Sequence, residues 1–228
     1  MIKIEEACVT GTEAAIRGMR NPKNSWEKSD SYFDGKYCKK CTHMDANCDS
    51  ENPCFKNGVL GENDLALMEK LVKAGTDHRK FMQFITVTCD ITAPLYWWKE
   101  FDTYKVGTVA NSCSTMHTIC NKEFTLDDFS HEHLFDEKGK GTEFLKDFKY
   151  TLAALNAARD LHLRTHDKKY WWQIIQLLPS YNQRRTVLLN YEVLLNMYRA
   201  RKNHKLDEWR DFCGWVECPP YMEVFLNV

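Results

Sequence analysis

The chain has 228 residues and a formal net charge of −1, so it is long enough to bury a substantial core and has no overall positive charge to favour nucleic-acid binding. Aromatic residues make up 13% of the sequence, which favours a packed globular protein over a disordered chain. No apolar run reaches the length of about 18 residues that a membrane-spanning helix needs, and the first residues do not resemble a secretory signal. We therefore expect a cytoplasmic protein that binds neither membranes nor nucleic acids.

The first part of the chain alternates between regular and irregular segments. Residues 2–10 have strand character, and residues 12–19 fit a short helix. Residues 20–62 are polar, rich in turn residues and without periodicity, so we expect a long loop with a cysteine-rich insert at about 30–62. A helix is expected over residues 63–75, and an alternating β-branched strand over residues 84–91.

The second part of the chain is richer in helix signals. Pro94 is typical of a helix start, whereas residues 103–118 contain many Thr, Ser, Gly and Asn and predict a loop with functional content. Further helices are expected after Thr142, before Pro179, around 193–198 and around 209–216, with a terminal strand over 221–226. The pattern favours an α+β fold in which helices are in the majority.

Residues 178–209 are the most informative stretch for function. Polar side chains recur there at helical intervals among apolar neighbours, directly after a proline break. These side chains are Arg184, Asn190, Asn196, Arg201, His204 and Trp209. Arginines and amides suit a phosphate group and the edge of a heteroaromatic ring, so we expect a ligand site in this stretch.

Four cysteines in the insert resemble a zinc site. Cys38 and Cys41 have the spacing of a zinc knuckle, whereas Cys48 and Cys54 are farther apart than zinc sites prefer. A structural zinc ion would explain how a long polar insert is ordered, and the alternative is an insert with free thiols or adventitious disulfides. The other six cysteines are expected to be reduced thiols or small core residues.

The chain resembles the flavin-dependent thymidylate synthases (ThyX), most clearly in its second half. Leu178-Pro179 is followed by an arginine, and the family spacing N-x5-N-x4-R is met by Asn190, Asn196 and Arg201. In the first half, Ala93-Pro94 leads into a helix as in the family. The family's R-H-R motif, however, is replaced by Thr103-Tyr104-Lys105. The resemblance covers about residues 64–118 and 142–218, and indicates a divergent ThyX-like branch of bacteria and phages. It implies a single ThyX-like α+β domain over residues 1–228, in which helices pack on a small, mostly antiparallel sheet.

The resemblance implies roles for individual residues. Arg201 would bind and polarise the pyrimidine ring of dUMP, which makes it the catalytic residue, and Arg184 and Ser114 would bind the phosphate. The residues that would bind FAD are Asn190, Asn196, Lys105 and His204.

The activity implied by the resemblance is an FAD-dependent, reductive one-carbon transfer to C5 of dUMP, giving dTMP. Methylenetetrahydrofolate would be the donor, NADPH the reductant, and the protein a homotetramer. The replacement of R-H-R favours an alternative, in which a non-catalytic or retuned nucleotide-binding protein has lost the usual flavin and folate chemistry. A third possibility is a zinc-stabilised interaction module built on residues 38–54.

Overall fold

The computed structural model describes residues 2–33 and 58–228. The four cysteines of the predicted zinc site, Cys38, Cys41, Cys48 and Cys54, lie outside the described residues. The chain divides into two compact units, so the expectation of a single domain stays a prediction. The larger unit comprises Ile4–Ile91, Tyr104–Asn111 and Thr186–Val228, and the smaller comprises Met1–Lys3, Thr92–Thr103 and Ser112–Arg185.

A four-stranded sheet has the order β1–β4–β6–β5. The strands are β1 (Lys3–Thr10), β4 (Thr86–Pro94), β5 (Thr108–Ser112) and β6 (Asn182–Asn190). At one end of the β4–β6 pair the Tyr191 N–H donates to the carbonyl of Ile85, and at the other the Leu95 N–H donates to that of Tyr181. The two strands are therefore antiparallel, and the predicted α+β fold with a small antiparallel sheet is confirmed.

Strand β4 follows from its alternating sequence. Val87, Cys89 and Ile91 are buried while the residues between them are not, as expected for a strand with one face on a core. The hydroxyls of Thr86 and Thr10 lie 2.9 Å apart and set the start of β4 against the end of β1. The strand predicted over residues 84–91 is confirmed as β4, which begins two residues later than predicted, at Thr86.

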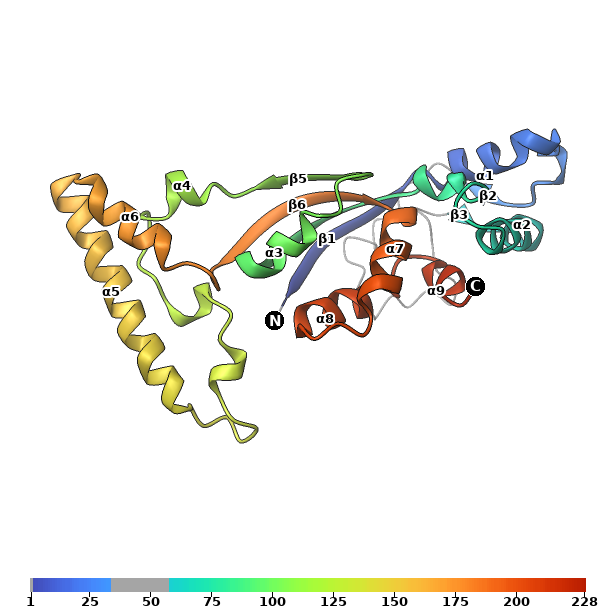
Figure 1. The fold of residues 1–228 in the computed structure, drawn as a ribbon. Coiled ribbons are helices and arrows are strands. Elements are labelled where there is room, and N and C mark those ends of the chain that lie inside the picture. The colour runs from blue at the N-terminus through green and yellow to red at the C-terminus, as the bar shows by residue number, and fades with distance from the viewer. Residues whose placement is uncertain (1, 34–57) are drawn as a thin grey trace. The chain divides into compact units, whose positions relative to one another are not determined.

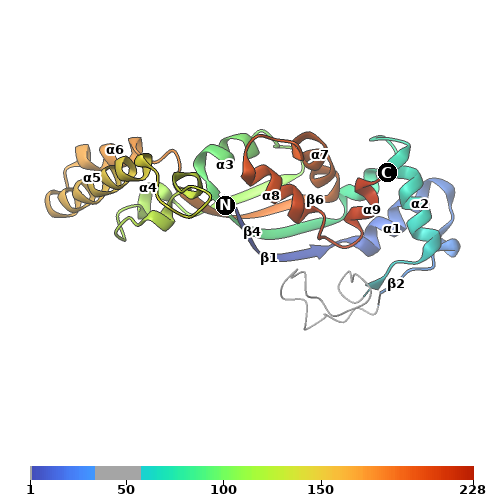
Figure 2. The same ribbon diagram turned by 90° about the horizontal axis from the view of Figure 1, so that it is seen from below.

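The larger unit contains several helices besides strands of the sheet. They are α1 (Thr12–Arg20), α2 (Glu62–Lys73), α7 (Tyr191–Arg201), α8 (Asp207–Val216) and α9 (Met222–Leu226). A two-stranded ribbon pairs β2 (Tyr32–Phe33) with β3 (Gly58–Val59). Figures 1 and 2 show α7 and α8 along the same face of the sheet. Trp209 and Phe212 of α8 are fully buried and contribute to this core.

The smaller unit is mainly helical, and two of its helices, α5 (Glu143–Thr165) and α6 (Lys168–Gln176), form a hairpin. The helices of this unit also include α3 (Leu95–Phe101) and α4 (Thr115–Thr118). Helices α5 and α6 pack side by side (Figure 1). His166 ends α5 in the left-handed region, with φ 55°. The core of the unit is formed by Ile119, Phe124, Phe129, Leu155, Ala158, Ile174 and Leu178. None of the helices in the described part of the chain is long and apolar enough to cross a membrane.

Three predictions about local structure were wrong. Arg184 does not lie on a helix, because residues 182–190 form strand β6 between β4 and β5. The predicted strand over 221–226 is helix α9, in which the buried Met222 and Phe225 have helical spacing. The loop predicted over residues 103–118 contains strand β5 and helix α4, because β5 pairs with β6 at the edge of the sheet.

Candidate functional site

Strand β6 passes directly into helix α7 at Asn190, which caps the helix. Its side-chain oxygen accepts a hydrogen bond from the Val193 N–H at 2.9 Å, a common use of asparagine at this position. The residue is buried, with 8% exposed. The amide oxygen of Asn190 thus holds the start of α7, and the contact of this residue with FAD stays a prediction.

Gly107 lies against this helix cap. Its φ is +77°, and a Cβ at this position would lie 2.5 Å from Nδ2 of Asn190 and 3.0 Å from Cγ2 of Val193. Glycine adopts such a backbone at little cost and leaves room for the amide. The segment before β5 can therefore approach the start of α7 closely only because residue 107 has no side chain.

The variant Gly107→Ala is expected to lower the free energy of unfolding by about 1–2 kcal/mol from the backbone conformation alone, and by more from the overlap with Asn190. The matched control is Gly139→Ala, where φ is +74° but no atom lies within 4 Å of the added Cβ. Urea unfolding of both variants separates the two costs. Equal losses would contradict a restrictive contact at the cap.

A buried ion pair ties the first turn of α7 to Arg79. Nε and Nη2 of Arg79 donate to Oε1 of Glu192 at 3.1 and 2.9 Å. Arg79 is 5% exposed and Glu192 6% exposed, so the two charges neutralise each other away from water. Nη2 of Arg79 also donates to Oδ1 of Asn196 at 3.1 Å, which connects the pair to an exposed amide on the next turn.

Arg201 sits in an aromatic cluster at the end of α7. Its Nε donates to the hydroxyl of Tyr104 at 2.9 Å. Its guanidinium lies 4.8 Å from the ring centroid of Trp209 and 5.6 Å from that of Tyr104. Stacking and hydrogen bonding together fix the plane of this cation, which is half-buried.

The other two residues of the predicted flavin site in the larger unit have different surroundings. Nδ1 of His204 accepts a hydrogen bond from the Leu206 N–H at 3.2 Å, and its ring lies 6.3 Å from that of Trp209. His204 thus shapes the turn between α7 and α8. Lys105 is exposed and stands next to Tyr104, the partner of Arg201.

Helix α7 does not place all the predicted ligand residues on one face. Asn196 and Arg201 are five residues apart, which corresponds to a rotation of about 140° around the helix axis. The two side chains therefore point to different sides of α7. A ligand of Asn196 and a ligand of Arg201 are expected to be different groups.

A groove of about 360 Å³ lies in the smaller unit beside the end of β5. Gln183 spans part of it, because its Nε2 donates to the Cys113 carbonyl at 3.1 Å and to the Thr115 hydroxyl at 2.9 Å. Arg185 supplies a cation: it donates to Oε1 of Gln183 at 3.0 Å and to Asp102 at 2.7 Å, and its guanidinium lies 4.2 Å from the Trp98 ring centroid. The lining of this groove thus includes the polar side chain of Gln183 and the cation of Arg185.

Ser114 and Arg184, the predicted phosphate residues, both belong to this region. Ser114 lines the groove and caps α4 by accepting the His117 N–H at 3.3 Å. The carbonyl of Arg184 accepts the Cys113 N–H at 3.0 Å, so strand pairing brings residues 184 and 113 side by side. Successive strand side chains point to opposite faces, so Arg184 and Arg185 face different ways, and Arg185 is the one that lines the groove.

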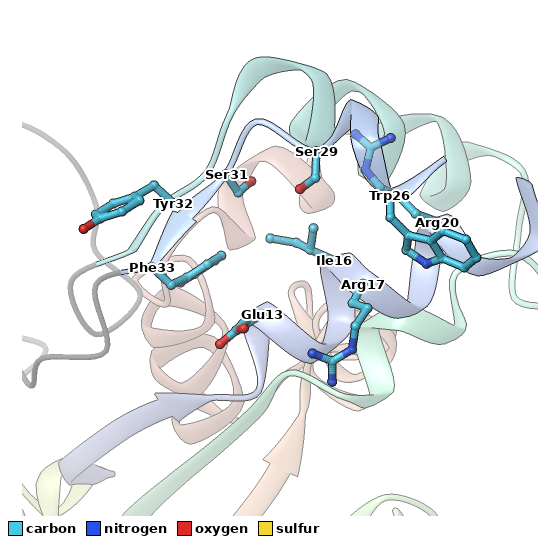
Figure 3. A pocket seen from close by; sticks show the side chains of 9 residues that line it. All are labelled: Glu13, Ile16, Arg17, Arg20, Trp26, Ser29, Ser31, Tyr32 and Phe33. Carbon is cyan, nitrogen blue, oxygen red and sulfur yellow. The ribbon is translucent and has the colours of Figure 1, made fainter. Parts of the chain in front are cut away.

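A second hollow, of about 400 Å³, lies beside α1 in the larger unit (Figure 3). Arg20 is buried there and donates to the fully buried Asp64 at 2.6 Å. Burial favours the neutral acid, but hydrogen bonds from Ser31, Ser29 and Arg20 hold the pKa of Asp64 below its usual range. Figure 3 shows the guanidinium groups of Arg20 and Arg17 pointing apart, so the cations do not converge on a common ligand.

The cysteines in the described part of the chain form no disulfide. Burial raises the pKa of Cys89 to about 12 and that of Cys213 to about 11. Both thiols are therefore protonated at neutral pH and are poor nucleophiles. This agrees with the prediction that they are small core residues. Within the described residues, no group of three or more His, Cys, Asp or Glu side chains is arranged to hold a metal ion.

Comparison with known proteins gives a match at the level of structure. No family model matches the sequence, and neither does any curated protein. The structure of thymidylate synthase X from Helicobacter pylori with FAD and dUMP matches with a TM-score of 0.65 at 15% identity, over 99% of this chain and 97% of that one. This chain has the ThyX fold.

Two further solved structures support this assignment. Another structure of H. pylori ThyX complexed with FAD and dUMP has a TM-score of 0.65 at 16% identity, over 97% of this chain and 98% of that one. The UMP/dUMP methylase PolB from Streptomyces cacaoi, bound with 5-Br dUMP, has a TM-score of 0.60 at 13% identity, over 100% of this chain and 95% of that one. The likeness to ThyX inferred from two sequence blocks is thus confirmed for the fold of nearly the whole chain.

Sequence reasoning missed three residues that the ThyX fold brings into these clusters. Arg79 and Arg185 belong to no recognisable sequence motif, and only the tertiary structure shows their partners, Glu192 and Asp102. Glu192 did give a signal, because it stands between apolar residues at the buried start of α7. A charge in such a run needs a partner of opposite sign, which could have prompted a search for a buried arginine.

Proposed function

We propose that this chain is a ThyX-like enzyme that binds FAD and a pyrimidine deoxynucleotide, and that it transfers a one-carbon group reductively to C5 of dUMP. The observation that carries the proposal is the fixed guanidinium of Arg201 between Tyr104 and Trp209. A preorganised cation of this kind stabilises negative charge that develops on a ring carbonyl. The proposal is also supported by the fold, because the similar proteins were solved with dUMP or its 5-bromo derivative.

Different residues would hold the two ends of the nucleotide. Arg201 would bind the pyrimidine ring and act as the catalytic residue, and Ser114 would bind the phosphate at the groove. Arg184 faces the other side of β6, so its predicted contact with a phosphate would require a second subunit of the proposed homotetramer. Arg185 adds a cation at the groove that Ser114 lines. These roles agree with the chemistry of the groups, since guanidinium and hydroxyl donors suit phosphate oxygens.

The described residues fit FAD in their chemistry. Asn196 offers an exposed amide and Lys105 an exposed ammonium, and a flavin dinucleotide has carbonyl and phosphate oxygens that accept from such donors. Bound FAD would supply the redox chemistry, with methylenetetrahydrofolate as one-carbon donor and NADPH as reductant. We further propose that Asn190 and His204 border the flavin, that the active form is a homotetramer and that it works in the cytoplasm.

One observation favours a second candidate, a nucleotide-binding protein with retuned or lost flavin chemistry. Tyr104 replaces the central residue of the family's R-H-R motif, and its hydroxyl accepts a hydrogen bond from Arg201. Asn196 likewise has a partner within the chain, Arg79. Both predicted ligand residues thus make contacts that a retuned protein could use for another substrate.

The visible spectrum of the purified protein and its ligand affinities separate the two candidates. We expect a yellow protein with flavin absorbance, or one that becomes so when FAD is added, and an increase in melting temperature with dUMP. Formation of dTMP from dUMP, methylenetetrahydrofolate and NADPH would support the enzyme. Flavin and dUMP binding without dTMP would favour the retuned protein, and binding of neither ligand would refute both.

A further inference from the structure

The side chain of Gln183 connects strand β6 to the loop that follows β5. Its Nε2 donates to the Cys113 carbonyl at 3.1 Å and to the Thr115 hydroxyl at 2.9 Å, and its Oε1 accepts from Nε of Arg185 at 3.0 Å. The amide thus uses both of its N–H groups on the loop, one on each side of Ser114. A guanidinium can only donate, so Arg185 requires the amide oxygen to face it and the amide nitrogen to face the loop.

The base from which Gln183 reaches the loop is itself held in place. Arg185 donates from Nη1 to Asp102 at 2.7 Å, its guanidinium lies 4.2 Å from the ring centroid of Trp98, and its side chain is 15% exposed. The indole N–H of Trp98 donates to the Gln183 carbonyl at 2.9 Å, which fixes the backbone of Gln183 as well. All these residues belong to the smaller unit. The position of the Gln183 amide is therefore determined independently of the loop.

Ser114 is the residue that this arrangement presents to the groove beside β5. It is exposed, it lines the groove, and its hydroxyl oxygen accepts the His117 N–H at 3.3 Å. That contact uses an oxygen lone pair and leaves the O–H proton to donate. Movement of Ser114 away from the groove would break one or both hydrogen bonds from Gln183 to the neighbouring residues.

We propose that Gln183 is a positioning residue for the nucleotide phosphate, because it holds residues 113–115 so that the Ser114 hydroxyl meets a phosphate oxygen at the groove. The inference rests on the proposed function, since it takes a phosphate at Ser114 as the ligand. Gln183 does not donate to that phosphate, because both N–H groups of its amide are used by the loop. Its effect is confined to the affinity that the phosphate contributes, and it is transmitted through Ser114.

Two substitutions remove the connection from its two ends. Gln183→Met keeps a long unbranched side chain without a hydrogen-bond donor, and Thr115→Val keeps the shape of threonine without its hydroxyl. We expect Gln183→Met to weaken dUMP binding about tenfold. Thr115→Val should have a smaller effect, because Gln183 still donates to the Cys113 carbonyl. Deoxyuridine, which lacks the phosphate, should bind to the wild type and to both variants with the same affinity.

A double-mutant cycle with Ser114→Ala shows whether Gln183 acts through Ser114. Loss of the serine hydroxyl should weaken dUMP binding about tenfold. If both substitutions remove the same contact, the double variant Gln183→Met/Ser114→Ala also loses about tenfold, whereas independent contributions would multiply to about a hundredfold. A merely structural role of Gln183 would change the affinities for dUMP and deoxyuridine alike and would not couple to Ser114.

The dissociation constants are measured on the whole chain by isothermal titration with dUMP and by NMR titration with deoxyuridine. Gln173→Met, an exposed substitution on α6 of the same unit, is the matched control and should leave both constants unchanged. Melting temperatures without ligand report whether each variant is folded, and Thr115→Val carries the test if Gln183→Met is not.

Three results would overturn the inference and leave the proposed function intact. They are unchanged dUMP affinity in the folded variants, an equal loss of deoxyuridine affinity, and losses that multiply in the double variant. Wild-type protein that does not bind dUMP would instead remove the proposed function and the inference together.

Discussion

Replacing Arg201 with alanine is expected to weaken dUMP binding by about tenfold to a hundredfold and to abolish detectable turnover. The guanidinium would interact with the pyrimidine through charge-assisted hydrogen bonds, each of which contributes about 1.5–3 kcal/mol. The aromatic cluster of Tyr104 and Trp209 holds this cation in place, so the substitution removes a donor whose orientation is fixed. Isothermal titration with dUMP and a dTMP assay measure the two effects.

Two controls make the Arg201 experiment specific. Arg201→Lys keeps the charge but lacks the planar fork, and we expect it to recover only part of the affinity. Arg199→Ala removes one positive charge two residues away on α7 and should change dUMP affinity little. Unchanged dUMP affinity in Arg201→Ala would contradict its assignment to the nucleotide site.

The variant Arg79→Met is expected to lower the free energy of unfolding by about 3–5 kcal/mol. It leaves the Glu192 carboxylate buried without its cation, and such a charge is costly. For a chain of this size the loss corresponds to a decrease in melting temperature of roughly 6–20 °C. Chemical denaturation followed by circular dichroism gives the free energy directly.

The double variant Arg79→Met/Glu192→Met tests the reason for this loss. Removing both charges from a buried site is often neutral, so we expect most of the stability to return. Arg210→Met is the matched control in the same unit, because its pair with Asp207 is half exposed and should be worth at most about 1 kcal/mol. A double variant as unstable as Arg79→Met alone would show that packing, and not charge, causes the effect.

Several elements could be predicted from the sequence because their signals are local. The alternation of Val87, Cys89 and Ile91 defines β4 without reference to any other segment. The same holds for the helix signals at Thr142 and at Trp209, where α5 and α8 were found. The spacing of Asn190, Asn196 and Arg201 resembles that of the ThyX family, and this resemblance predicted the fold that the structural comparison shows.

Other elements could not be predicted because the deciding partner is distant in the chain. Whether residues 182–190 form a strand or a helix depends on β4 and β5, which offer backbone hydrogen bonds on both sides. The segment 222–226 is too short to show a clear hydrophobic periodicity. Its helical conformation places Met222 and Phe225, three positions apart, on the same buried face.

The sequence by itself determined the fold class, the main helices and strands, and which side chains around α7 were candidates for ligand binding, since these follow from residue type and local periodicity. Only the tertiary structure decided how those side chains are held. Arg79 and Glu192 are 113 positions apart and Tyr104 and Arg201 are 97 apart, and no local pattern encodes such pairs. Folding brings each pair together because a buried charge needs a partner and a stacked guanidinium needs an aromatic face.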